Sequence, residues 1–268
     1  SGSRSTTTDS SGNYSFSGVT SGNYTITPSK TGYTFSPVSK TFTVSNANVT
    51  GQNFTATVSL AAYYPFTGNA NDAIGNGNNG TVYGATLTTD RYGNPNRAYL
   101  FNGEENYIEA PIPSSVLQDG SFTVSYWMQY EWQPHRIWVM YFDCSGAEYS
   151  GFHALINVND EFAADQVHRG DTQMGFSYET QNRFNITALQ GSWLHIATVY
   201  DAQNKTLKSY LNGGLIDEDA TYSPHNIHGC INLIGHGGEA YFKGSIDEIR
   251  IYNRALSASE ILDLYNNY

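Results

Sequence analysis

A loop near residue 70 has the composition of a site for a hard cation. The stretch GNANDAIGNGNNGTV, residues 68–82, contains five Asn, four Gly and a single charge, Asp72. Ca²⁺ takes six to eight oxygen ligands and often mixes carboxylate, amide and backbone carbonyl oxygens. Asp72, the amide of Asn78 and the backbone of Gly77 could supply such a mixture, because glycine lets a carbonyl turn inward. The alternative is that Asp72 and Asn76 only cap turns through hydrogen bonds.

A second stretch, YWMQYEWQPHRIWVMY at residues 126–141, has the residue types of a sugar-binding surface. Sugar sites combine an aromatic platform with polar groups in a concave surface. Trp132 and His135 lie in EWQPHR between two strand-like runs, and Asp143 and Tyr149 are possible polar partners further along. Packing of Trp132 over the edge of a sheet is the alternative. Trp127 lies within a strand-like run and is expected to be buried.

The composition indicates the class of protein that must position these residues. Of the 268 residues, 39% are hydrophobic and only 14% charged, and Tyr, Gly, Thr and Asn are abundant. This profile is typical of a β-rich extracellular protein. The net charge of −11 argues against nucleic acid as a partner. No run of residues is long and apolar enough to span a membrane, so membrane insertion is not expected.

The chain begins with Ser and shows no signal peptide, so it is expected to be a processed or excerpted piece of a longer protein. Cys144 and Cys230 are the only two cysteines. They are compatible with one disulfide in an oxidising compartment or with two buried thiols.

Residues 1–58 show short strand-like runs with alternating apolar and polar residues, separated by turn signals such as DSSG and TSG. The pattern predicts part of a small β-sandwich. The segment TTTDSSGNYSFSGVTSGNYTITPSKTGYTFSP, residues 6–37, resembles the carboxypeptidase regulatory-like, prealbumin-type repeat of bacterial surface proteins. The resemblance implies an Ig-like spacer whose first two strands are absent.

Residues 59–268 contain many strand-like runs and no helical periodicity before the end of the chain. This pattern predicts one large two-sheet sandwich or jelly roll. Ser257 with Glu260 three residues later forms a capping-box signal for a short C-terminal helix. The expected fold is therefore all-β, with a small partial sandwich at 1–58 followed by a jelly roll at 59–268.

The second segment resembles the laminin G-like, concanavalin A-like jelly roll. The matching motifs include YPFTGNANDAIGNGNNGTVYGA, RAYLFNGEENYIEAP, WLHIATVYD and GSIDEIRIYNRALSASEI, and they occur in the family's order. The resemblance implies that the first and last strands lie side by side and often hold a calcium ion. It therefore brings Asp247 of SIDEIR next to the Asp72 loop, as a second carboxylate for a structural Ca²⁺.

No catalytic residues are predicted. Glucanases of the same superfold use a Glu-x-Asp-x-x-Glu strand that places both carboxylates in one cleft, and this motif is missing. Gly-x-Ser-x-Gly and His-Glu-x-x-His are missing as well. The chain is therefore expected not to be an enzyme.

The resemblance implies a binding or adhesion module at a bacterial cell surface or in the secreted fraction, with a glycan or a cell-surface or matrix partner. The alternative is a structural role, in which neighbouring copies complete the partial first sandwich by strand addition and form a filament. Residue patterns do not name a ligand, since fold does not fix function.

Overall fold

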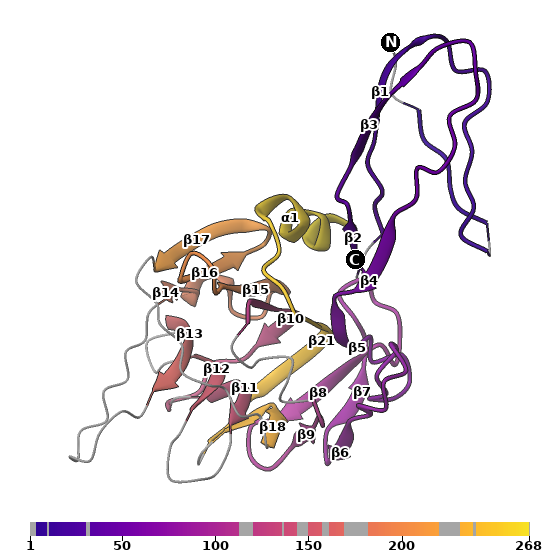
Figure 1. Cartoon of the computed structure of the whole chain (residues 1–268). Coiled ribbons are helices and arrows are strands. Elements are labelled where there is room, and N and C mark those ends of the chain that lie inside the picture. The colour runs from indigo at the N-terminus through magenta and orange to yellow at the C-terminus, as the bar shows by residue number, and fades with distance from the viewer. Residues whose placement is uncertain are drawn as a thin grey trace. The chain divides into compact units, whose positions relative to one another are not determined.

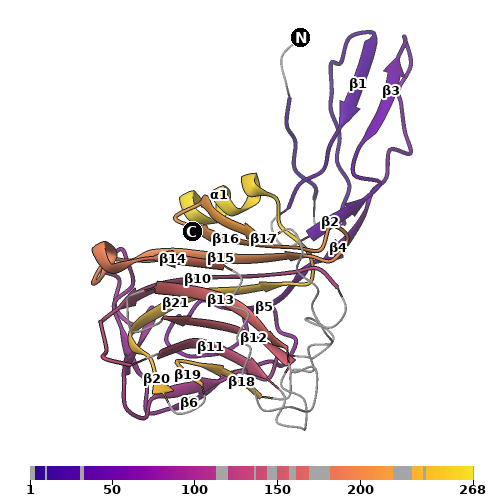
Figure 2. The same ribbon diagram turned by 90° about the vertical axis from the view of Figure 1, so that its left-hand side faces the viewer.

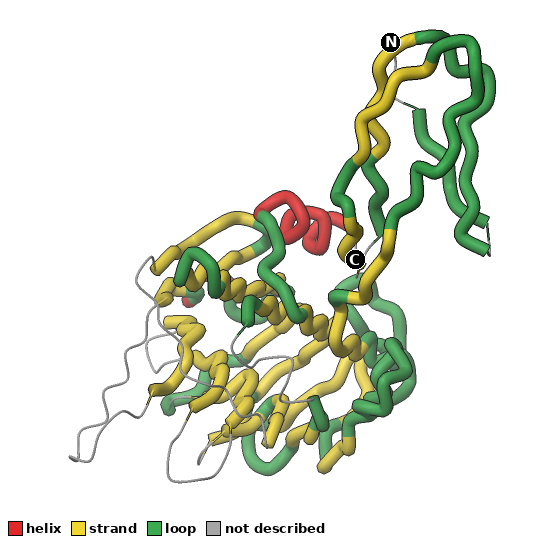
Figure 3. Tube along the Cα trace, viewed as in Figure 1, coloured by secondary structure: helices red, strands yellow, loops and turns green. Residues whose placement is uncertain are grey.

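The computed structural model describes residues 4–9, 11–30, 33–112, 120–135, 137–143, 150–156, 161–168, 182–219, 231–237 and 240–267. The chain divides into two compact units, Ser1–Val58 and Ser59–Tyr268. In both units the described elements are almost entirely strands and loops (Figure 3). The predicted all-β fold with a short C-terminal helix is confirmed.

The first unit contains two antiparallel strand pairs, β1 (Gly22–Ile26) with β3 (Lys40–Val44) and β2 (Tyr33–Ser36) with β4 (Thr55–Val58). Half-buried and exposed residues alternate along β1, β2 and β3, as in a sheet with one covered face. Among the residues of this unit whose burial is described, none is fully buried. The unit therefore has an apolar face but no closed core in the described residues.

The second unit is a sandwich of two antiparallel sheets, which Figures 1 and 2 show as stacked layers. The eight-stranded sheet contains, in spatial order, β17 (Gly214–Asp219), β16 (Thr206–Leu211), β15 (Leu194–Asp201), β10 (Phe122–Tyr130), β21 (Lys243–Tyr252), β8 (Ala98–Asn102) and β7 (Thr86–Thr88), with β5 (Leu60–Tyr64) also on β21. The seven-stranded sheet contains β14 (Asn182–Asn185), β13 (Glu161–His168), β12 (Ser150–Ile156), β11 (Ile137–Asp143), β18 (Ile231–Ile234), β9 (Tyr107–Glu109) and β6 (Thr81–Tyr83). A small hairpin, β19 (His236–Gly237) with β20 (Ala240–Tyr241), and a 3₁₀ turn (Thr187–Leu189) are further described elements of this unit.

The core lies between the two sheets and follows from strand alternation. Along β10, Phe122, Val124, Tyr126 and Met128 point into it, while the residues between them face the opposite side of the sheet. That opposite side is also covered, so all but one residue of β10 is buried. A central strand with two covered faces loses the polar–apolar alternation of a half-exposed strand.

The C-terminal helix α1 (Ala258–Asn267) covers the outer face of the eight-stranded sheet. Its N-terminus is the predicted capping box: the Glu260 carboxylate accepts the Ser257 N–H at 2.9 Å, and the Glu260 N–H donates to the Ser257 hydroxyl at 3.3 Å. Leu256, Ile261 and Leu264 pack against the sheet. In the described part of the chain no helix is long and apolar enough to cross a membrane.

Candidate functional site

Along one of its edges, strand β21 pairs first with one strand and then with another. The place between these two pairings forms the candidate site of the second unit. On one edge β21 pairs with β8 over Lys243–Ile246 and with β5 over Ile249–Tyr252. Asp247 and Glu248 lie between these two pairings. The pairing of β5 with β21 also confirms that the first and last strands of this unit lie side by side.

On its other edge β21 forms a β-bulge against β10. Ser125 is opposite Arg250 and Trp127 is opposite Asp247, so two residues of β21 face one residue of β10. Glu248 has φ 54°, a left-handed conformation that few non-glycine residues adopt. Because Ile246 and Ile249 both point into the core, the bulge leaves the carboxylates of Asp247 and Glu248 together outside it.

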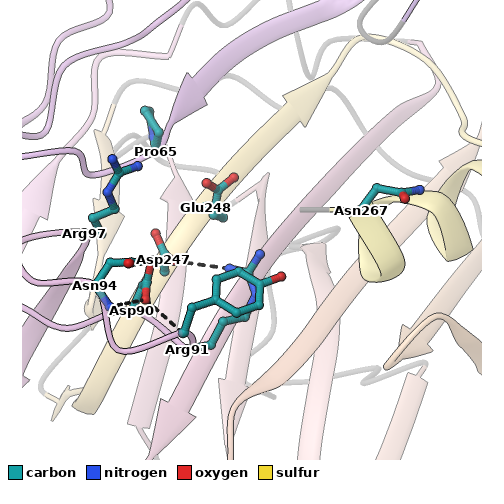
Figure 4. A pocket seen from close by; sticks show the side chains of 9 residues that line it. Pro65, Asp90, Arg91, Asn94, Arg97, Asp247, Glu248 and Asn267 are labelled. Carbon is teal, nitrogen blue, oxygen red and sulfur yellow. Dashed lines mark hydrogen bonds and ion pairs between the residues drawn. The ribbon is translucent and has the colours of Figure 1, made fainter.

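A pocket of about 230 Å³ opens at this place, and we call it the Arg91 pocket. Its lining comes from the end of β5, the loop between β7 and β8, the bulge of β21 and the end of α1: Pro65, Asp90, Arg91, Tyr92, Asn94, Arg97, Asp247, Glu248 and Asn267. Figure 4 shows the side chains of Asp90, Arg91 and Asp247 gathered beside β21, with Asn267 of α1 further to the side.

The loop that carries Arg91 is held in shape by Asp90. The Asp90 carboxylate accepts the backbone N–H groups of Tyr92 at 2.8 Å and Asn94 at 2.9 Å, and the side-chain amide of Asn94 at 2.9 Å. Burial alone would raise the pKa of Asp90, but the hydrogen bonds from Asn94 and Tyr92 outweigh it, and the pKa is lowered. The turn thus has a fixed carboxylate as its centre.

Arg91 is the most constrained cation of the pocket. Its guanidinium lies 4.3 Å from the ring centroid of Trp127 and 4.5 Å from that of Tyr92, and it pairs with Asp247 at 3.3 Å. Both members of the pair are nearly inaccessible, with side chains 7% and 3% exposed. Burial, together with the neighbouring Glu248, raises the pKa of Asp247 to about 8 although Arg91 opposes the shift.

Three groups in the Arg91 pocket are suited to contact a ligand. Tyr92 is 68% exposed. The guanidinium of Arg97 is exposed and has no ion pair or side-chain hydrogen bond within the described residues. The buried Oδ1 of Asp247 has no hydrogen-bond partner there either. A pocket with an aromatic wall, a free cation and an unsatisfied buried oxygen is suited to a polar organic ligand.

The second carboxylate of the bulge is engaged by other groups. Glu248 forms an ion pair with Arg250 and accepts the Tyr63 hydroxyl at 2.8 Å. The Arg250 guanidinium also lies 4.4 Å from the ring of Tyr63 and donates to its hydroxyl at 3.1 Å. Tyr63 and Arg250 therefore hold Glu248 at the rim of the pocket.

The loop predicted to bind calcium is closed by hydrogen bonds. Oδ1 of Asp72 accepts the N–H groups of Tyr63 and Ile74, each at 3.0 Å, and Oδ2 accepts the amide of Asn78 at 3.2 Å. Asp72 and Asn78 are thus brought together, as expected, and both are only 5% exposed. Gly77 adopts φ 83°, which glycine permits and which the turn requires.

The fourth predicted calcium ligand faces another environment. Asp247 is paired with Arg91, and no hydrogen bond of the described residues joins it to the Asp72 loop. A cation at Asp72 would have to displace N–H groups from both carboxylate oxygens, so the donor set as arranged does not fit Ca²⁺ well. No group of three or more His, Cys, Asp and Glu suited to a metal occurs among the described residues. Calcium binding stays a prediction.

The residues predicted to form a sugar site around Trp132 are spread along β11. Trp132, 47% exposed, and His135 precede this strand, whereas Asp143 is its last residue. Seven residues at about 3.3 Å each separate the two ends by roughly 20 Å. Tyr149, Cys144 and Cys230 lie outside the described residues. Trp127 is buried as expected, but it packs under α1, stacked on Tyr265, rather than between the sheets.

Solved structures with the same architecture include a domain of an arabinanase and the binding domains of several toxins. Domain 4 of AbnA, an extracellular GH43 arabinanase from Geobacillus stearothermophilus solved with arabinotriose, aligns with a TM-score of 0.56 and 20% identity over 78% of this chain and 98% of that domain. The binding domain of botulinum neurotoxin DC, solved with SialylT, aligns with a TM-score of 0.58 and 14% identity over 78% of this chain and 51% of that one. At these identities the likeness establishes a shared fold.

The curated relatives are much longer proteins. Botulinum neurotoxin type E of Clostridium butyricum is 22% identical over 200 residues, which cover 70% of this chain and 15% of the toxin. The chain thus spans a small part of the relatives it matches. Residues 1–59 match the family described as BOS complex subunit NOMO1-like, second beta sandwich domain. This supports a β-sandwich for the first unit, while its carboxypeptidase regulatory-like assignment stays a prediction.

Residues 102–262, more than half of the chain, match the Laminin_G_3 family. The match includes β10, β15 and the bulged β21, and of the residues that line the Arg91 pocket it includes Asp247 and Glu248. The chain belongs to the concanavalin A-like lectin/glucanases superfamily.

Proposed function

We propose that residues 59–268 form a non-catalytic carbohydrate-binding module of an extracellular protein, with its ligand in the Arg91 pocket. The observation that carries this proposal is the exposed Tyr92 in one concavity with two groups that have no partner among the described residues, the guanidinium of Arg97 and the buried Oδ1 of Asp247. Sugars present an apolar ring face beside a rim of hydroxyl groups. An aromatic wall with polar atoms at its base complements both.

The size of the pocket limits what it accepts. Its volume of about 230 Å³ lies just below the ~300–1,000 Å³ of drug-sized pockets. We therefore propose that it holds one sugar unit, while the remainder of a longer glycan lies along the surface. Support comes from the fold neighbours, one of which was solved with arabinotriose and another with SialylT. A cell-surface or matrix glycan is accordingly the proposed partner.

The carboxylates of the pocket support a binding role rather than a catalytic one. Glycosidases need two available carboxyl groups on opposite sides of the scissile bond. Here Asp247 pairs with Arg91, Glu248 pairs with Arg250, and Asp90 is saturated by N–H donors. The pocket residues thus offer no opposed pair of available carboxyl groups.

The proposal is tested by applying the whole chain to a glycan array together with two matched variants. Tyr92→Ala removes the aromatic wall of the Arg91 pocket, and Trp132→Ala removes the exposed aromatic of the alternative site on the loop before β11. We expect Tyr92→Ala to weaken binding about tenfold or more, equivalent to about 1.4 kcal/mol, and Trp132→Ala to leave it unchanged. The opposite result would move the site to Trp132, and a blank array would refute carbohydrate binding.

A second candidate function rests on the first unit. Its half-buried apolar positions, which include Tyr24, Phe35 and Phe42, lie on one face of short two-stranded pairs, and no residue of these pairs whose burial is described is fully buried. Such pairs are marginal on their own and present free edges for strand addition. Neighbouring copies of the chain are the proposed partners in this case, which would make it the subunit of a filament.

A further inference from the structure

Two polar atoms of the Arg91 pocket are buried without a hydrogen-bond partner in the described part of the chain. They are Oδ1 of Asp247 and Nε of Arg91. A buried polar atom left unpaired destabilises the fold, and native structures contain few of them. Both atoms belong to pocket-lining residues, and Asp247 is only 2% exposed. A ligand that satisfies both atoms would remove this cost.

The two residues are held in place before any ligand arrives. Arg91 is fixed between the rings of Tyr92 and Trp127, and its Nη1 already pairs with the other oxygen of Asp247. Since neither side chain has to be ordered on binding, these two atoms add little ordering cost for a ligand that reaches them. The Nε–H group is a donor only, while a carboxyl oxygen accepts.

The charge of the pocket selects against acidic ligands. Three carboxyl groups and two guanidinium groups line it, and the buried guanidinium of Arg91 is committed to Asp247. The remaining cation, Arg97, is exposed, where ion pairs contribute little to binding. Above about pH 8, where Asp247 is ionised and neutralises Arg91, an added carboxylate would meet Asp90 and Glu248 without a buried counter-charge.

We infer that the Arg91 pocket selects an uncharged sugar unit with two neighbouring free hydroxyl groups, and that Asp247 and Arg91 determine this preference. One hydroxyl donates to Oδ1 of Asp247 and its neighbour accepts from Nε of Arg91. The inference rests on the proposed carbohydrate-binding function and adds the class of sugar. Asn94 and Arg97 at the rim then contact the outer hydroxyls.

The test uses saturation-transfer NMR and calorimetry with the whole chain and probes matched in size. The neutral probes are arabinotriose, maltotriose and cellotriose, and the acidic probe is trigalacturonate. The best neutral probe is also prepared with O2 and O3 methylated, which removes the hydroxyl donors without any change to the protein. We expect the methylated sugar and trigalacturonate each to bind at least tenfold more weakly than the unmodified neutral sugar.

Protein variants give an independent readout. Asp247→Asn and Arg91→Lys are expected to weaken the neutral sugar at least tenfold, and Lys208→Gln, in an exposed ion pair on β16, serves as the control. If trigalacturonate binds as tightly as the neutral sugar, or if methylation has no effect, the inference is wrong while carbohydrate binding stands. If no sugar binds, the proposed function fails with it.

Discussion

Asp72 and Asp247 are both buried carboxylates, yet their surroundings differ completely. Asp72 accepts three N–H groups through its two oxygens, whereas one oxygen of Asp247 has no partner among the described residues. A saturated carboxylate organises its own loop, and an unsaturated one next to a pocket is available to a ligand. The chemistry of each residue therefore follows from which N–H groups reach it.

The saturated state of Asp72 leads to a prediction about stability. Asp72→Ala leaves the part-buried N–H groups of Tyr63 and Ile74 without acceptors. It should lower the free energy of unfolding by about 2–6 kcal/mol, since each unpaired donor costs about 1–3 kcal/mol. We expect this loss in urea unfolding with and without EDTA, and no effect of EDTA on the unaltered chain.

The calcium hypothesis makes the contrary prediction for the same experiment. A bound ion stabilises the folded state by mass action, so EDTA would lower the Tm of the unaltered chain. Neither Asp72→Ala nor Asp247→Ala would then respond to EDTA. That pattern would establish a structural Ca²⁺ and overturn the hydrogen-bonded interpretation of the loop.

Among the elements, β15 carries a buried histidine beneath the C-terminal helix. His195 is 1% exposed, its Nε2 lies 2.9 Å from the Ser125 hydroxyl, and its ring contacts Trp127 and Tyr265 of α1. Burial, reinforced by Arg250 and Arg91, lowers the pKa of His195 to about 3. The histidine is therefore neutral in the folded protein over most of the pH range.

This lowered pKa predicts acid destabilisation with a definite sign. Below about pH 6.5 the unfolded chain protonates His195 and the folded chain does not, so stability falls by up to about 1.4 kcal/mol per pH unit. Between pH 7 and 5 the loss is about 2 kcal/mol. The stability that His195 contributes is fully present above pH 6.5 and is lost as the pH falls toward 3.

The effect of His195 on the pH dependence of stability has to be measured against a variant, because Asp247 changes the stability in the opposite direction. Its pKa is raised to about 8, so the folded state binds that proton more readily and gains stability as the pH falls. Urea unfolding at pH 7 and 5 should therefore be compared between the unaltered chain and His195→Gln. Equal pH dependence in the two proteins would show that His195 titrates normally.

The sequence predicted the elements that depend on local pattern. The capping box needs only Ser257 and Glu260 three residues apart, and the pairing of β5 with β21 follows from the order of the family motifs. The Arg91 pocket depends on an ion pair between residues 156 positions apart and on a bulge. Glu248 at φ 54° gives no signal of that bulge, whereas a glycine would have suggested one.

The sequence does contain one pattern that could have indicated the pocket. The segment DRYGNPNR, residues 90–97, places an aromatic between charged residues in a turn-rich stretch directly before a strand. The pattern is of the same type as the one around Trp132, which predicted a sugar site. The sequence does not tell whether Trp132 or Tyr92 is the better aromatic wall for a sugar. That depends on which groups, distant in the sequence, surround each ring.

At the scale of the whole molecule, the two units differ in how much core they contain. The second unit has a large core between its sheets, while the described residues of the first are at most half-buried. An apolar face of this kind gains stability only when something covers it. If neighbouring copies cover it, association should depend on protein concentration.

Light scattering during gel filtration measures this association, and two substitutions on adjacent residues of β3 locate it. Phe42 is on the half-buried face, and Thr41 is on the exposed face. If copies pair through the apolar face, the mass of the unaltered chain and of Thr41→Lys should rise above 29.5 kDa with concentration. Phe42→Lys should stay at the monomer mass, because an inward-pointing charge blocks strand addition. A constant mass of 29.5 kDa for the unaltered chain at every concentration would refute the filament and leave the binding module as the function of the chain.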